Sequence, residues 1–487
     1  MVTNGRINHI APPCGTHSCK KLKIMSNSAH IYDKLKQLAG CGEQIIAHLD
    51  HLVNTQVNVI LHAAQFIAME ARWRGLMLLA QSLPSSKTVR LKLLPANWAE
   101  IIHDCDRGNP EQTWLFEQIY NQEFALPGGE PFGLIIGDYT LGPSTAGNEQ
   151  VVATLSVVAS IMAAAFCPFI AGAAASCVTL TNYQELNRLP DLLGRIKSHE
   201  FIRWQCFRQR EDARFIGLVA PRILLRNPYK KNELHRTIGF AFDEAVADDG
   251  ATLCWGNAAF AFALNVMNNF IRHGWFAELH GIRDISPQGG YIDETLLEPY
   301  RPLNEIDNIL RQPPVEIRLT TDQQQQFCAF GLIPVATSYL LEGIVFNTSQ
   351  SLFLPPTKKQ NSGHENLELS VMLQYVLCVS RFAHFLKIIM RTEIGKFINN
   401  KNLQKRLQDW LLTYTLAGNN YDPNLRARYP LRDCKVSIHE IAGRPGLFNC
   451  ILDLQPYLNF DSLHASFRLI IDAPALAITR LHPAQSA

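Results

Sequence analysis

The sequence predicts a mixed α/β (α+β) fold, because segments with helix periodicity and segments with strand periodicity occur in the same chain. Apolar residues recur at three- and four-residue steps over about 43–80 and 366–391, which is the spacing of one helix face. Short apolar runs typical of buried strands lie between them, at 132–136 and 215–225. The last fifty residues alternate between apolar and polar side chains, as antiparallel strands do. We therefore expect a mixed sheet core with packed helices and C-terminal antiparallel strands.

The N-terminal part is expected to hold an irregular extension followed by one long helix. Residues 1–30 are polar and show no secretory signal. The helix is predicted to run from about Glu43 to Ala80. The run VRLKLL at 89–94 is then the predicted first strand of the α/β region.

An uncharged segment requires a membrane test. No Asp, Glu, Lys or Arg occurs between Glu149 and Glu185, and this length is sufficient to span a bilayer. However, Pro168 divides the segment, and its flanks carry neither a basic cluster nor an aromatic belt. We predict a helix of small residues buried between packed layers, with no membrane insertion.

The second half is predicted to contain a long helix with two different faces. One face is apolar: Met372, Val376, Val379, Ala383, Leu386 and Met390. The other carries a basic stripe: Arg381, His384, Lys387 and Arg391. The alternating residues of the predicted C-terminal strands are Val436, Ile438, Phe448, Cys450, Leu452 and Leu454.

A region boundary is expected at Pro313 and Pro314. We divide the chain into an irregular extension, a helical region, a central α/β region, a second mixed or helical region and the C-terminal strands. Their limits are 1–30, 31–85, 86–312, 313–430 and 431–487.

Composition limits the classes of function. The chain has 487 residues, enough for two or three domains. Charged residues make up only 18%, where soluble chains carry roughly 25%, so we expect surface hidden by a membrane or by neighbouring subunits. The net charge of +2 provides no global field to attract nucleic acid. Twelve scattered cysteines indicate reduced thiols in the cytosol.

The stretch FGLIIGDYTLG contains the one carboxylate, Asp138, that is placed as in many α/β active sites. The sequence contains neither GxSxG nor GxxxxGK[ST], and only hydroxyls lie nearby. The favoured interpretation is structural: Gly137 permits a tight exit from a buried strand, and Asp138 caps the following turn. A cytosolic α/β enzyme using Asp138 is the alternative.

Other candidate sites are weaker. CGTHSC at 14–19 lacks the second ligand pair of a structural zinc site, and His48 and His51 lack the Glu of HExxH, so no metal is expected. Six arginines lie between Arg203 and Arg226. We interpret them as ion-pair networks rather than a nucleic-acid surface, because Glu and Asp are interleaved and the Arg fork binds carboxylates.

Several blocks carry a family resemblance. They include WRGL, PGGEPFG followed by GDY, FR-x-x-x-D-x-R and SR-x-AH-x-LK, within matching blocks from about Leu49 to Ile471. In combination they resemble the large sheath subunit of bacterial type VI secretion, the TssC family, also called VipB, ImpC or EvpB. The resemblance implies the contractile-tail sheath fold and a structural, non-enzymatic role without cofactor or catalytic residues.

The resemblance also implies partners. Such a subunit pairs with a small sheath protein (TssB or VipA), and the pairs build stacked six-subunit rings around a tube of Hcp protein. The sheath grows in the cytoplasm from a baseplate docked at the envelope, contracts to deliver effectors, and is disassembled by the ATPase ClpV. A phage-like or extracellular contractile injection particle is the alternative within the same class.

We expect subunit contacts on the basic stripe and on the C-terminal strands. Strand exchange between subunits would hide edge backbone groups, which agrees with the low charged fraction. The predicted contact residues are Arg381, His384, Lys387, Arg391, Val436, Ile438, Phe448, Cys450 and Leu452.

Overall fold

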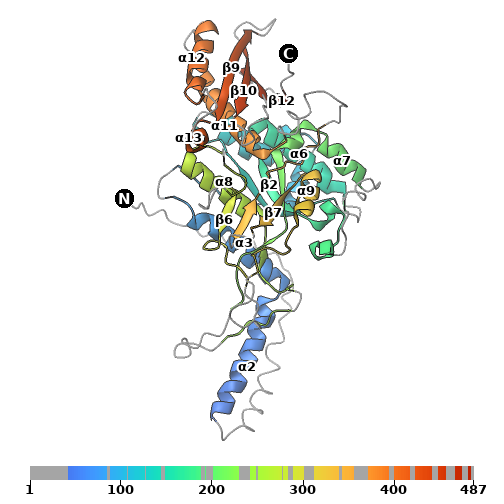
Figure 1. The fold of residues 1–487 in the computed structure, drawn as a ribbon. Coiled ribbons are helices and arrows are strands. Elements are labelled where there is room, and N and C mark those ends of the chain that lie inside the picture. Colours follow the sequence, from blue (N-terminus) through green and yellow to red (C-terminus); the bar gives the residue numbers. More distant parts are fainter. Residues whose placement is uncertain are drawn as a thin grey trace, which may run out of the picture. The chain divides into compact units, whose positions relative to one another are not determined.

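The computed structural model describes the greater part of the chain, in two units (Figure 1). The first unit comprises 1–62 with 229–245, and the second 63–228 with 246–487. The described residues are 42–84, 88–106, 108–126, 128–143, 149–187, 192, 201–229, 242–247, 250–276, 278–282, 289–300, 312–338, 343–355, 371–393, 400–416, 423–440, 448–456, 467–473 and 481–483.

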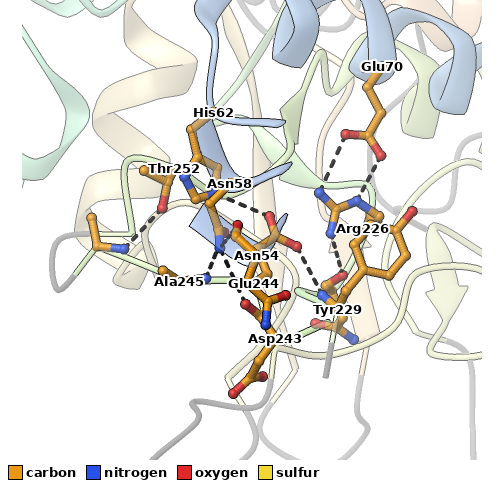
Figure 2. Close-up of polar contacts among 12 residues, drawn as sticks. Asn54, Asn58, His62, Glu70, Arg226, Tyr229, Asp243, Glu244, Ala245 and Thr252 are labelled. Atoms are coloured by element: carbon orange, nitrogen blue, oxygen red, sulfur yellow. Dashed lines mark hydrogen bonds and ion pairs between the residues drawn. The ribbon is translucent and has the colours of Figure 1, made fainter. Parts of the chain in front are cut away.

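The first unit contains helix α2 (Gly42–Leu61), which is tied to a distant segment of the same unit. Figure 2 shows the Asn58 side chain donating to the carbonyl of Asp243 (3.4 Å) and accepting from the amide of Ala245 (2.9 Å). The carboxylate of Glu244 accepts from the amide of Tyr229 at 2.9 Å. These hydrogen bonds join α2 to the segment 242–245.

The single helix predicted over 43–80 is wrong in one respect, because it is two helices. α2 ends at Leu61 and α3 (Ala64–Gln81) begins after Ala63, whose backbone is extended at φ −62 and ψ 125. An extended residue cannot continue the i to i+4 hydrogen bonds, so the helix stops there.

The second unit is built on a six-stranded mixed sheet in the order β1-β2-β3-β7-β8-β6. Its strands are β1 (Ile135–Leu141), β2 (Phe169–Ala173), β3 (Ile216–Ala220), β6 (Tyr291–Asp293), β7 (Leu332–Thr337) and β8 (Gly343–Phe346). β1, β2, β3 and β7 are parallel, and β8 and β6 continue the sheet antiparallel. The mixed α/β class predicted from the sequence is confirmed.

Helices cover both faces of this sheet (Figure 1). Successive residues of β2 point to opposite faces, so Ile170 packs with α8 (Ala259–His273) and α3, whereas Phe169 packs with α6 (Glu149–Ala165) and α11 (Leu373–Glu393). α6 is the small-residue helix predicted to lie between layers, and its Leu155 and Ile161 are fully buried.

One described helix is long and apolar enough to cross a membrane. The 18-residue window Leu373–Met390 of α11 has a mean hydropathy of 1.3, and 72% of it is buried inside the protein. A core helix of a folded domain passes the same test, and the position of α11 against the sheet is that of a core helix.

Shorter elements complete the unit. These are α4 (Trp98–Cys105), η1 (Pro110–Gln112), α5 (Trp114–Phe116), the π-helix η2 (Glu117–Ala125), η3 (Ala175–Val178), η4 (Tyr183–Asn187), α7 (Ile202–Arg208), η7 (Glu211–Phe215), β4 (Ile223–Leu224), β5 (Trp255–Gly256) and α9 (Thr321–Ala329). β4 and β5 form a separate two-stranded sheet.

The strand predicted at 89–94 is wrong, because this segment pairs with no described strand and β1 is the first strand. Its basic side chains instead bind acidic residues of the same unit, Arg90 to Glu130 and Lys92 to Glu123. Alternation of charged and apolar residues therefore has another cause here: ion pairs on one side and exposed leucines on the other.

The C-terminal part forms a second sheet, which is antiparallel as predicted. Its strand order is β12-β11-β10-β9. Its strands are β9 (Leu431–Glu440), β10 (Phe448–Pro456), β11 (Phe467–Ala473) and β12 (Leu481–Pro483). Helices α12 (Asn400–Leu412) and α13 (Pro423–Arg428) precede it.

The boundary predicted at Pro313 falls between strands that belong to the same central sheet. β7 follows this residue and pairs with β3, which precedes it. The backbone carbonyl of Pro314 also accepts from the amide of Leu224 at 2.9 Å. Residues on both sides of 313 thus build the same sheet.

Candidate subunit-contact site

Arg381, the first residue of the predicted basic stripe, is stacked on aromatic rings of its own subunit. Its guanidinium carbon lies 4.4 Å from the ring centre of Phe270, 5.0 Å from Phe385 and 5.7 Å from Trp275. Burial lowers the pKa of Arg381, and its Nε is buried with no hydrogen-bond partner among the described residues. The rings hold the charge through cation–π attraction rather than through a carboxylate.

His384 is buried, with 8% of its surface exposed. Its Nε2 donates to the carbonyl of Ala165 at 2.9 Å, at the end of α6, and its ring lies 5.4 Å from that of Phe124. Burial lowers the pKa of His384 to about 4, with a further contribution from the charges of Arg381 and Lys387. The residue is thus a neutral link between α11 and α6 at neutral pH.

This burial predicts acid sensitivity. The folded pKa of His384, about 4, lies below its value of 6.5 in the unfolded chain. Protonation therefore favours the unfolded state: stability from this group is complete above pH 6.5 and declines to pH 4, by about 3 kcal/mol. Urea denaturation at steps between pH 7 and pH 4 measures the slope, which should be shallower in His384→Gln, where a donor remains but no ring titrates.

His280 provides the internal reference for that experiment. It is half-buried as a residue, its Nε2 lies 2.7 Å from Oγ of Ser349, and desolvation of the ring lowers its pKa to about 4 as well. Part of the slope should therefore remain in His384→Gln and become smaller when His280 is also replaced. An identical slope in the wild type and in His384→Gln would contradict the assignment.

The remaining basic residues of the stripe lie further along α11. Nζ of Lys387 is 3.4 Å from the ring centre of Phe124 and 5.0 Å from that of Tyr120. Arg391 belongs to α11, but its side chain lies outside the described residues. The structure thus brings Arg381, His384 and Lys387 into contact with aromatic and backbone groups of their own subunit.

The predicted contact residues of the C-terminal strands pair directly with one another. Cys450 opposes Ile438, and Leu452 opposes Val436. Val436, Cys450 and Leu452 are almost fully buried in the core, and Ile438 packs on its edge. The side chain of Phe448 lies outside the described residues. Contacts of this sheet with another chain would therefore use its backbone edges or its opposite face.

Asp138 lies inside β1, so the prediction that it caps the turn after a strand is wrong. The register of β1 against β2 shifts between Gly137 and Thr140, the part of the strand that contains Asp138. Nε of Arg72 is 3.1 Å from Oδ2 of Asp138, and Nδ2 of Asn257 is 3.4 Å from Oδ1. Burial raises the pKa of Asp138, and Arg72 opposes that shift.

Asp138 forms a structural ion pair between β1 and α3, and a hydrogen bond from Asn257 connects it to the start of α8. Neither of its described partners is a nucleophile or a second carboxylate. No group of three or more His, Cys, Asp or Glu side chains able to hold a metal occurs among the described residues. The segment CGTHSC at 14–19 lies outside them.

The arginine-rich block confirms the expected ion pairs at three positions. They are Arg210 with Asp212 (3.1 Å), Arg222 with Glu316 (2.7 Å) and Arg226 with Glu70 (2.7 Å, Figure 2). Arg208 donates to backbone carbonyls instead, and Arg214 lies over the ring of Phe353 at 4.6 Å.

A set of exposed apolar residues on α3 was missed by sequence reasoning. Met69, Trp73 and Met77 are 49%, 66% and 55% exposed, and they recur every four residues along one helix face. The four-residue spacing is present in the sequence, within the helix predicted over 43–80. Periodicity identifies an apolar face without showing whether the chain itself covers it.

Comparisons with known proteins identify the family. A model described as "EvpB/VC_A0108, tail sheath N-terminal domain" matches residues 43–353, more than half of the chain, and its companion "tail sheath gpW/gp25-like domain" matches 362–472. The gap between the two matches covers residues 354–361.

A curated relative covers nearly the whole chain. The type VI secretion system sheath protein TssC1 of Pseudomonas aeruginosa is 30% identical over 94% of this chain and 89% of its own length. A solved sheath tail protein from Desulfitobacterium hafniense has a TM-score of 0.29 at 10% identity. The match spans 65% of this chain and 59% of that one.

The family is structural, because its models describe tail sheath domains and its relative is a sheath protein. The expectation of a non-enzymatic role is confirmed on that ground. The chain belongs to the EvpB/VC_A0108 tail sheath family, the large subunits of the type VI secretion contractile sheath.

Proposed function

We propose that this sheath subunit assembles with a small sheath subunit of the TssB/VipA type into six-subunit rings, which stack into a tubule around an Hcp tube. The tubule forms in the cytoplasm on an envelope-anchored baseplate, contracts to deliver effectors and is recycled by ClpV. The observation that carries the proposal is the similarity to the Pseudomonas aeruginosa sheath protein along 94% of the chain.

The exposed apolar residues of the subunit support the proposal that another chain covers part of its surface. The exposed residues Met69, Trp73 and Met77 form an apolar face on α3, and Leu93 is 67% exposed nearby in the sequence. Large apolar side chains grouped on one helix face are typical of surfaces that another chain covers. The low charged fraction of 18% agrees with this.

The contact positions on α11 and on the C-terminal sheet belong to the same proposal. Lys387 and Arg391 are one helical turn apart at the end of α11, where a neighbouring subunit or the tube would meet them. The C-terminal sheet would meet a neighbour through the backbone edge of β12 or through its opposite face, because Val436, Cys450 and Leu452 are buried.

Electron microscopy of the chain co-expressed with its small sheath partner, beside the chain alone, tests the assembly. Hollow striated tubules are expected only in the co-expressed sample, since the exposed apolar face requires a partner. Monodisperse single particles in both samples would contradict sheath assembly.

The same assay tests the α11 contact. Lys387→Glu with Arg391→Glu should reduce tubule yield, because charge reversal at a contact introduces repulsion. Lys401→Glu with Lys405→Glu is the matched control, with the same spacing on exposed positions of α12. Unchanged yield and contraction in the first variant would remove the contact from the proposal.

A further inference from the structure

Helix α12 lies along the outer edge of β9, which is the strand at one end of the C-terminal sheet. Its apolar residues Leu403, Leu407 and Leu411 recur every four positions and are buried. Gln404 and Gln408 follow the first two of these leucines by one position, so the same packing places both amides over the edge of the strand.

These amides bind the backbone of β9. Gln404 Nε2 donates to the carbonyl of Val436 at 2.8 Å. Gln408 Nε2 donates to the carbonyl of Cys434 at 2.8 Å, and its Oε1 accepts from the amide of Val436 at 2.9 Å. The amide of Cys434 is bound by Oδ1 of Asp433 at 2.8 Å. The backbone amide and carbonyl of Cys434 and of Val436 are thus all hydrogen-bonded to side chains.

The match has a geometric basis. Residues four apart on a helix are separated by about 6 Å along its axis, since the rise is about 1.5 Å per residue. Residues two apart on a strand are separated by about 6.6 Å, and they present their backbone groups to the same edge. Two glutamines at i and i+4 therefore fit two successive outward-facing residues of a strand.

The start of the same edge is closed by main chain. The amide of Leu431 donates to the carbonyl of Tyr414 at 3.2 Å, and the amide of Leu416 donates to the carbonyl of Leu431 at 2.9 Å. On its other side β9 pairs with β10. From Leu431 to Val436 these outward groups are hydrogen-bonded within the subunit.

We propose that Gln404 and Gln408 are an edge guard that prevents β9 from pairing with a strand of a second copy of this chain. An unprotected edge strand offers a row of free amides and carbonyls on which another strand can add. The guard fills that row with side chains that cannot extend a sheet. The inference concerns the subunit by itself and does not depend on the partner proposed above.

Hydrogen–deuterium exchange resolved to single amides tests the guard in the full chain. Gln404→Leu with Gln408→Leu removes the three amide-mediated bonds at similar volume, so exchange at Val436 should accelerate about fivefold, the factor for one ordinary hydrogen bond. Gln408→Glu retains an acceptor but no donor, so Val436 should remain protected in that variant.

Sedimentation velocity of the chain without any partner measures self-association. The double-leucine variant should form dimers and larger species at concentrations where the wild type does not. Lys401→Leu with Lys405→Leu adds the same apolar groups to exposed positions of α12 and should not self-associate.

Two outcomes would overturn the guard. One is unchanged protection of Val436 in the double-leucine variant. The other is equal self-association of the glutamine and lysine variants, because added apolar surface would then explain it. If the double variant does not fold, Gln408→Leu alone removes the acceptor of the Val436 amide and should accelerate its exchange, and Gln404→Leu, which leaves that acceptor in place, is the comparison.

Discussion

Replacing Phe382 by alanine is expected to lower the free energy of unfolding by about 3–5 kcal/mol, the usual cost of truncating a buried phenylalanine. The side chain is fully buried. Its ring lies 4.5 Å from that of Trp275, 5.8 Å from Tyr414 and 6.0 Å from Trp410. The cavity would therefore open in the middle of an aromatic cluster that joins α11 to α12. Urea denaturation followed by tryptophan fluorescence measures the loss.

Phe385 offers a matched control on the same helix. It also contacts Trp410, at 6.1 Å, but it is 39% exposed. Its replacement by alanine should cost about 1 kcal/mol, because water already reaches the ring and no closed cavity forms. Equal shifts of the urea midpoint for the two variants would show that the cluster around Phe382 is not the centre of stability assigned to it.

The elements that the sequence predicted correctly are those whose burial is one-sided and local. The apolar face of α11, for example Val376 and Leu386, is buried as its helical spacing indicated. The alternation through Val436 and Leu452 gave the C-terminal strands for the same reason. The helix and each strand contain their own complete pattern of apolar residues, so these elements could be predicted without knowing what packs against them.

The failures have a common cause in contacts between distant residues. His384 belongs to a polar stripe by spacing, yet it is buried because the carbonyl of Ala165, more than 200 positions earlier, accepts its hydrogen bond. Arg381 is held by Phe270 and Trp275 in the same way. A helix pattern assigns polar residues to solvent, and only the tertiary neighbours decide otherwise.

The functional residues likewise separate into those that could be recognised from the sequence and those that could not. Sequence blocks identified the sheath family, because a combination of motifs along the chain is specific even where each motif is short. They did not reveal Gln404 and Gln408, since glutamines on a helix are ordinarily solvated. Their partners on β9 are known only once α12 is placed beside the strand.

The second large effect is expected at Arg208, which is only 2% exposed. Its Nε donates to the carbonyl of Leu352 at 2.9 Å and its Nη2 to that of Ala329 at 3.0 Å. Arg208→Met should lower the free energy of unfolding by about 2–5 kcal/mol, because it removes two hydrogen bonds from a charged donor and leaves the buried carbonyl of Leu352 without its partner. Arg208→Lys should recover only part of this, since one ammonium lacks the planar fork that bonds both carbonyls. Urea denaturation of the three proteins gives the comparison.

Arg210 is the control that separates a buried guanidinium from an exposed one in the same block. It pairs with Asp212 at 3.1 Å, and 47% of its side chain is exposed. Arg210→Met should change the free energy of unfolding by about 0–1 kcal/mol, because solvent screens such a pair. Burial lowers the pKa of Arg208 to about 10, so its charge is retained at neutral pH and the carbonyl dipoles must stabilise it. A loss at Arg208→Met no larger than at Arg210→Met would mean that water reaches those carbonyls, and the link from α7 to Ala329 and Leu352 would then not hold these segments together.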